Sequence, residues 1–142
     1  MNIPKHIDSE GRNWGRSCWS GDSPIPQGHI PASWVKFIKR DREYQDDEER
    51  PLPVDWKSAR IVQGVFNNLK SPVLRHVMCS YWVRIYILNE RRSDELTVRF
   101  LNALVDSGRI DVPPGFRFSL HQYRADICFI AKEMEAAFEI CV

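Results

Sequence analysis

Apolar residues recur every three or four positions along most of the chain beyond residue 50, and this spacing predicts amphipathic helices. The first predicted helix covers 56–69 and the second covers 73–88, with apolar residues on nearly all of its sides. Asp55 and Ser71 precede them as expected N-caps, because a short polar side chain can accept the free amide protons of a first helical turn. Pro72 suits the first position of the second helix, where its missing N–H costs nothing. We expect the second helix to lie at the centre of the core.

Two further helices are predicted after residue 92. Ser93 is the expected N-cap of the third, whose apolar stripe runs over 96–105, and Gly108 is expected to end it in a left-handed conformation. Residues 119–122, Ser-Leu-His-Gln, have the form of a capping box, in which Ser caps the helix and Gln returns a bond from three residues later. They open a fourth helix whose apolar stripe continues to Phe138. Residues 51–142 are therefore predicted to form a helical domain.

The first 50 residues have a different character. Four prolines and four glycines fall within the first 33 positions, which predicts loops rather than long regular elements. One short helix, capped at 8–10, is expected to run through Trp14 and Trp19, and the cost of leaving Trp in water predicts that this arm docks on the core. Residues 41–50 form an acidic connection, so the boundary is expected at 50/51. The predicted fold class is mainly α, a small domain of about four to five helices with a helix-turn-helix-like C-terminal part and an irregular N-terminal arm over 1–50.

Composition limits the class of protein. The 142 residues are 43% hydrophobic and 27% charged, as in a soluble globular domain. No apolar run approaches the ~20 residues of a membrane span, and the N-terminus lacks the apolar segment of a secretory signal. Four scattered cysteines favour a reducing, cytoplasmic location. The net charge of +1 gives no general attraction to polyanions, so any contact with nucleic acid is expected to be local.

Motifs that carry catalysis are missing from the sequence. It has no Gly-rich phosphate loop, no HExxH and no nucleophile elbow. Its four histidines are far apart, and Cys18 and His29 have no paired ligands at zinc-knuckle spacing. We therefore expect no enzymatic activity, no metal, no cofactor and no small-molecule substrate, and nothing in the residues supports a nuclease accessory.

The start of the fourth predicted helix carries the most informative polar residues, His121, Gln122 and Arg124. A DNA recognition helix needs long polar side chains in its first turn and, behind them, an apolar stripe that packs on the preceding helices. Gln can form two hydrogen bonds with adenine, and Arg can form two with guanine. Nearby arginines are expected to contact phosphates, which position a protein without reading sequence. These arginines are Arg91, Arg92, Arg99, Arg109 and Arg117.

Short segments of the chain resemble the antitermination Q proteins of lambdoid phages, in the branch without a zinc-binding insertion. They are 13–18 (Asn-Trp-Gly-Arg-Ser-Cys), 55–59 (Asp-Trp-Lys-Ser-Ala), 74–83 with its Leu-Arg-His-Val-Met and Tyr-Trp-Val, and 118–124 (Phe-Ser-Leu-His-Gln-Tyr-Arg). The resemblance spans most of the chain apart from the acidic connection. It implies a helical part similar to the helix-turn-helix in the fourth region of a primary sigma factor.

The function implied by the resemblance is that of a phage transcription antitermination factor. Such proteins bind double-stranded DNA near a late promoter, contact bacterial RNA polymerase paused just downstream, and travel with it so that terminators are ignored. By position, the recognition helix would begin with Ser119, His121, Gln122 and Arg124. The residues of the N-terminal arm that would contact polymerase are Arg12, Trp14, Arg16 and Trp19.

A protein-interaction module is the alternative, in which a helical phage protein binds and inhibits a host factor without touching DNA. The near-neutral charge, the acidic end of the last helix and the Trp-rich arm support it, since Trp and Arg favour interface centres. A gel shift with the DNA around its own gene separates the two hypotheses.

Overall fold

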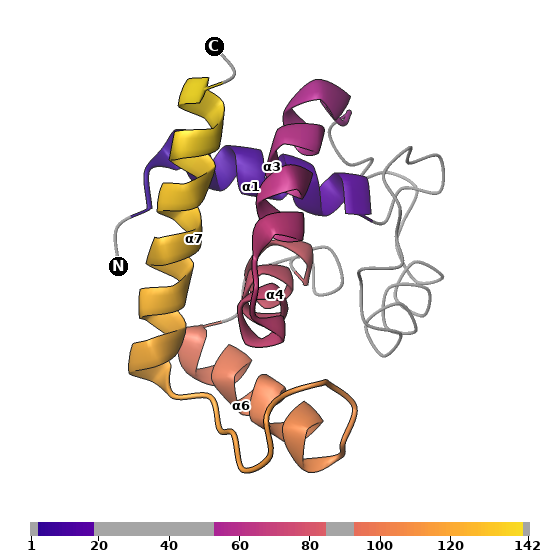
Figure 1. The fold of residues 1–142 in the computed structure, drawn as a ribbon, viewed down its shortest axis with the longest axis vertical. Coiled ribbons are helices and arrows are strands. Elements are labelled where there is room, and N and C mark those ends of the chain that lie inside the picture. Colours follow the sequence, from indigo (N-terminus) through magenta and orange to yellow (C-terminus); the bar gives the residue numbers. More distant parts are fainter. Residues whose placement is uncertain (1–2, 19–52, 85–92, 141–142) are drawn as a thin grey trace.

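The computed structural model describes residues 3–18, 53–84 and 93–140, and every regular element in these ranges is a helix. In chain order, as labelled in Figure 1, they are α1 (Lys5–Cys18), α3 (Trp56–Asn68), α4 (Pro72–Met78), the π-helical segment η1 (Cys79–Val83), α6 (Asp94–Asp106) and α7 (Leu120–Ile140). The prediction of a mainly helical fold is confirmed for these residues.

The expected caps set the starts of three helices. Asp55 Oδ1 accepts a hydrogen bond from Ser58 N at 3.2 Å, and Ser93 Oγ accepts one from Leu96 N at 3.3 Å. Ser119 does the same for α7, as described below. Ser71 occupies the N-cap position of α4 but its side chain makes no capping bond, so Pro72 at the first helical position is the stronger start signal there.

Gly108 ends α6 as predicted, with φ +66°. Its N–H donates to Val105 O at 3.1 Å, and Arg109 N–H donates to Leu104 O at 2.9 Å. These two bonds form a Schellman motif, which satisfies carbonyls that the helix end would otherwise leave without partners.

The N-terminal segment differs from the expectation of loops and one short helix. α1 is a continuous helix of 14 residues that begins at Lys5, so Asp8 lies in its first turn instead of capping it. Gly11 is required because the indole of Trp82 packs directly on the helix there, where a Cβ would lie 2.3–2.5 Å from the ring atoms. Trp82 Nε1 also donates to Asp8 Oδ1 at 3.0 Å. A contact with a distant part of the chain, invisible to local propensity, therefore accounts for this helix.

The expectation that Trp14 docks on the core is confirmed. Its side chain is 0% exposed, and its Nε1 donates to Gln63 Oε1 at 2.9 Å. Asn13 ties α1 to the start of α3, since its Nδ2 donates to Asp55 O at 2.9 Å and its Oδ1 accepts from Asp55 N at 2.8 Å. Trp19, the acidic connection and the predicted boundary at 50/51 lie outside the described residues.

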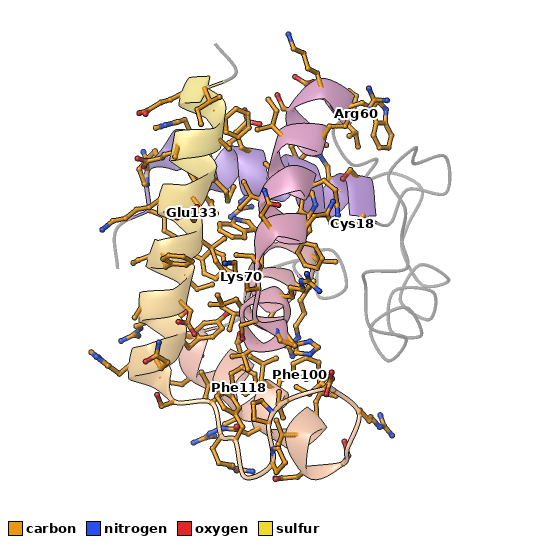
Figure 2. All side chains as sticks on the ribbon, viewed as in Figure 1. Cys18, Arg60, Lys70, Phe100, Phe118 and Glu133 are labelled. Atoms are coloured by element: carbon orange, nitrogen blue, oxygen red, sulfur yellow. The ribbon has the colours of Figure 1, made fainter. Side chains whose placement is uncertain are left out.

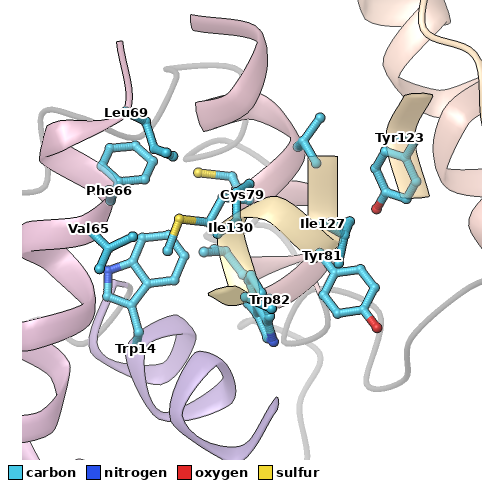
Figure 3. Close-up of a cluster of buried hydrophobic side chains, with 14 of the residues drawn as sticks. Trp14, Val65, Phe66, Leu69, Cys79, Tyr81, Trp82, Tyr123, Ile127 and Ile130 are labelled. Carbon is cyan, nitrogen blue, oxygen red and sulfur yellow. The ribbon is translucent and has the colours of Figure 1, made fainter. Parts of the chain in front are cut away.

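The core forms where α1 crosses α3 and α7 (Figure 1). The Trp14 and Phe66 rings have centroids 5.4 Å apart, and both lie in the apolar cluster of Figure 3. Trp82 is fully buried in the same cluster with Ile127 and Ile130 of α7. The apolar stripes that the sequence predicted for α3 and α7 are thus the faces of these helices that pack together.

The structure describes the second predicted helix as far as Arg84. The helix changes from α-helical to π-helical hydrogen bonding after Met78. Arg84 N–H donates to Cys79 O at 3.1 Å, the five-residue spacing of a π-helix. Ser80 contributes to the local geometry, because its Oγ donates to Val77 O at 2.7 Å and lies 3.2 Å from the hydroxyl of buried Tyr123. Residues 76–83 are all buried, in the α-helical turn as in the π-helical one, as expected for a helix at the centre of the core.

Candidate nucleic-acid interface

The connection between α6 and α7 is long but firmly held. Asn102 on α6 forms two bonds with one backbone position: its Nδ2 donates to Phe118 O at 3.0 Å and its Oδ1 accepts from Phe118 N at 2.8 Å. Phe118 itself is buried, as is Ile110 earlier in the connection. The residue that precedes the N-cap of α7 is therefore fixed from two sides, by packing and by hydrogen bonding.

The middle of this connection contains a defined turn. Phe116 N–H donates to Pro113 O at 3.0 Å, and Gly115 has φ +77°. Pro at the second position and Gly with positive φ at the third are the features of a type II turn. The Phe116 and Phe118 rings then meet edge to face at 4.9 Å. Residues 107–119 are thus a packed structure in place of the three- or four-residue turn of a helix-turn-helix.

The first turn of α7 directly follows this packed connection. Ser119 Oγ accepts a hydrogen bond from Gln122 N at 3.2 Å, which confirms the predicted cap. Tyr123 and Ile127 on the inner side of the helix are buried. The exposed residues include six that the sequence analysis assigned to DNA binding, namely Arg109, Arg117, Ser119, His121, Gln122 and Arg124. Arg91 and Arg92 lie outside the described residues.

Several of these exposed side chains already have partners. Arg124 Nε lies 3.0 Å from Asp94 Oδ2, and its Nη2 lies 3.6 Å from Glu95 Oε1. Arg117 forms an ion pair with Asp106. Because exposed ion pairs are each worth about 0–1 kcal/mol, these arginines can exchange their partners for a phosphate or a base at small cost.

Gln122 departs from the predicted capping box. Its Nε2 donates to Asp126 Oδ1 at 2.8 Å, so the side chain points along α7 and not back to the cap. The pKa of Asp126 is raised because the carboxyl is partly buried, an effect that the bond from Gln122 opposes. The amide that was expected to read a base therefore donates to a carboxylate on its own helix.

The charge around α7 is mixed. Residues 93–140 contain five Lys and Arg against eight Asp and Glu, a balance of −3. In contrast, residues 53–84 contain five against one, a balance of +4. No role was predicted for the cations of this second range, although the three-residue spacing of Lys57 and Arg60 on the first predicted helix was visible in the sequence. Figure 2 places Arg60 of this range toward the end of the long axis opposite to Phe118.

The residues predicted to contact polymerase do not share one environment. Trp14 belongs to the core, so its side chain is not at a surface that a partner can reach. Arg12 is exposed and pairs with Asp8 at 3.1 Å, and Arg16 is half-buried in the last turn of α1. The accessible part of this predicted site is thus reduced to the two arginines, with Trp19 outside the described residues.

Buried titratable groups in the core are poor candidates for chemistry. Burial raises the pKa of the Cys79 thiol to about 12 and raises the pKa of Cys18 as well, which keeps both thiols protonated and unreactive. Over 3–18, 53–84 and 93–140, no group of three or more His, Cys, Asp or Glu side chains is arranged to hold a metal ion. The helices in these ranges also include none with the length and apolarity needed to cross a membrane.

Comparison of the chain with protein-family models, with curated proteins and with solved structures finds no match.

Proposed function

We propose that this protein is a DNA-binding regulator of transcription in the bacterial cytoplasm, and that it acts as an antitermination factor through contacts with RNA polymerase. The observation that carries the proposal is the first turn of α7, where His121, Gln122 and Arg124 are exposed while the opposite side of the same helix is buried. This is the arrangement that a recognition helix needs in order to enter a major groove.

The support behind this turn matters as much as its side chains. A reading helix must hold its residues in a fixed register, because base-edge hydrogen bonds depend on position and angle. The paired bonds between Asn102 and Phe118 and the cap at Ser119 provide that register. Arg109 and Arg117 in the connection are exposed where they can meet phosphates beside the groove.

A binding experiment tests the base-reading role directly. Fluorescence anisotropy at moderate salt compares duplexes from the DNA around the gene with a shuffled duplex. Arg124→Ala is expected to weaken the specific complex by about 1–3 kcal/mol, roughly 5- to 150-fold, with the loss confined to one base position. Lys132→Ala is the matched control, because Lys132 is an exposed cation of the same helix. Equal losses on specific and shuffled duplexes would contradict base reading by Arg124.

The polymerase contact and the antitermination activity rest on the resemblance. Transcription in vitro through a terminator, with and without the protein, tests them, and increased read-through that requires the cognate promoter DNA is the expected result. Arg12→Ala and Arg16→Ala are expected to lower read-through without changing DNA affinity. Unchanged termination with DNA-bound protein would remove the antitermination part of the proposal.

A protein-interaction module is the second candidate function. It is favoured by large apolar side chains at the surface, with Leu96 49%, Phe129 48% and Ile140 83% exposed. Phe129 and Ile140 lie on α7, which ends with several glutamates, and exposed apolar residues beside acidic ones suit a protein partner better than a polyanion. Failure to bind any duplex at micromolar protein would favour this second function.

A further inference from the structure

The exposed side of α3 carries a row of cations and amides. Lys57, Arg60, Gly64, Asn67 and Asn68 follow one another at three-, four-, three- and one-residue intervals, which places them on one side of a helix. The buried residues of α3 occupy the other side and pack on α1 and α7. This row therefore faces outward along the whole length of the helix.

Two cations extend the row beyond the helix end. Lys70 follows directly and is exposed, and Arg75 reaches back from α4 with its Nη2 3.4 Å from Asn67 O. The Arg75 guanidinium lies 5.8 Å from the centre of the Phe66 ring, a contact that orients it beside the last turn of α3. Lys57 and Lys70 are separated by roughly 20 Å at helical rise. We name Lys57, Arg60, Asn67, Asn68, Lys70 and Arg75 the α3 stripe.

Lys57, Arg60 and Lys70 differ from Arg117 and Arg124 in having no acidic partner among the described residues. Within the ranges that the structure describes, none of the three makes an ion pair, whereas Arg117 and Arg124 both do. The one acidic residue in 53–84 is Asp55, and both of its carboxylate oxygens already accept bonds from Ser58. Glu10 of α1 also lies beside Ser58, at the N-terminal end of the row. The stripe therefore has its acids at one end, and Arg60 and Lys70 farther along it make no ion pair with a described residue.

The remaining residues of the stripe suit a close, sequence-independent contact. A Cβ built at Gly64 would meet nothing within 4 Å, so the helix backbone is open to approach at the middle of the row. Asn67 and Asn68 add amide donors at its end. Trp56, at the start of the row, is the one partly exposed aromatic side chain beside it, and none is exposed between Lys57 and Lys70, so the row has no series of rings on which successive unpaired bases could stack.

We infer that the α3 stripe is a second nucleic-acid contact, which binds the phosphate backbone of duplex DNA without reading its sequence. Charge complementarity selects a polyanion, and the lack of a series of exposed rings selects a duplex over a single strand. The inference rests on the proposed function in that both concern DNA. The two sites occupy different parts of the molecule, because the stripe runs from Arg60, toward the end opposite to Phe118, to Lys70 near the middle of the long axis, whereas α7 begins at the Phe118 end (Figure 2). The stripe supplies affinity, and the start of α7 supplies specificity.

The salt dependence of binding tests this inference. Lys57→Gln/Lys70→Gln in the full chain removes two stripe charges, and Lys5→Gln/Lys132→Gln is the matched control, since it removes two exposed lysines elsewhere. On a shuffled duplex, the stripe pair is expected to reduce the slope of log K against log salt by about 1.8, because each phosphate contact contributes about 0.9. The control pair is expected to leave the slope near that of the unchanged protein.

Each result of this experiment is decisive. Equal slopes for both pairs would overturn the stripe, and so would stripe-dependent binding that is tighter for single-stranded RNA than for duplex DNA. The stripe pair should lower affinity by the same factor on specific and shuffled duplexes, and a loss confined to the specific duplex would also overturn it. If Arg124→Ala leaves sequence discrimination intact while the stripe pair lowers the salt slope, the proposal that Arg124 reads a base is rejected. The proposal that the α3 stripe binds phosphates is then still supported. Thermal unfolding of both pairs excludes misfolding as the cause.

Discussion

Replacing Gly11 with Ala places a methyl group against the indole of Trp82. The added Cβ would lie 2.3 Å from Nε1, 2.4 Å from Cε2 and 2.5 Å from Cδ1 of that ring. Carbon contacts become comfortable at about 3.5 Å, so α1 and the ring must separate by roughly 1 Å. Trp82 is fully buried and its Nε1 is bonded to Asp8 on the same helix, so it has no free direction in which to move.

The expected cost combines three effects. Overpacking of this kind costs about 1–3 kcal/mol. Loss of the bond between Trp82 and the Asp8 carboxylate would add about 1.5–3 kcal/mol. Ala is favoured over Gly inside a helix by about 1 kcal/mol, which offsets part of the loss. The net expectation is a destabilisation of about 1.5–5 kcal/mol, which lowers Tm by on the order of 10 °C in a domain of this size.

Urea unfolding followed by Trp fluorescence and circular dichroism measures this effect as a shift of the midpoint at constant slope. Gly64→Ala is the matched control, because Gly64 also lies inside a helix but a Cβ there meets nothing within 4 Å. That variant is expected to gain up to about 1 kcal/mol. Combining Gly11→Ala with Trp82→Leu should reduce the cost of the Ala, since contacting residues do not add independently. A Gly11→Ala protein as stable as Gly64→Ala would refute the packing of α1 on Trp82.

Two further predictions concern the connection that supports α7. Asn102→Ala is expected to lower the free energy of unfolding by about 1–3 kcal/mol, because it leaves the Phe118 backbone groups without partners. Asn68→Ala is the control, since Asn68 is at an exposed helix end, and it should change the free energy of unfolding by less than about 0.5 kcal/mol in the same thermal unfolding assay. Burial lowers the pKa of His76, which lies 3.3 Å from Asp111 O, below its ordinary value of about 6.5. As the pH falls, His76 therefore takes up a proton in the unfolded chain before it does so in the folded chain. The contribution of neutral His76 to the free energy of unfolding should be fully present above pH 6.5 and should decline as the pH falls below that value. His76→Gln should show a smaller decline between pH 7 and 5, and identical pH profiles would exclude His76 as the cause.

Local rules in the sequence predicted most of the helix ends, although Ser71 makes no capping bond with its side chain and Asp8 lies inside α1 instead of capping it. The caps at Asp55, Ser93 and Ser119 and the left-handed Gly108 each depend on a few neighbouring residues, and all four were predicted correctly. Such signals are readable because the bonds that satisfy a helix end come from within a turn of it.

α1 was predicted only in part: a helix through Trp14 was expected, but neither its start at Lys5 nor its requirement for Gly11 was, and that requirement comes from a distant residue. Glycines that weaken an isolated helix become necessary once Trp82 packs on Gly11, and Trp14 is satisfied by Gln63 on another helix. Local propensity correctly describes the isolated segment, and tertiary packing outweighs it. The α3 stripe is the opposite case, since its spacing was visible, but whether its cations are paired with acids is known only from the structure.

The two proposed DNA contacts share a feature that links the fold to its function. Asn13 of α1 bonds both the N–H and the C=O of Asp55, which is the N-cap of α3. Asn102 of α6 does the same for Phe118, which directly precedes the N-cap of α7. In each case a side chain from the preceding described helix fixes the backbone where a contact helix begins, so little conformational freedom is left to lose on binding. Helices held in this way can present the stripe and the reading turn in fixed positions, and this argues that the rigidity of both helix starts serves recognition as well as stability.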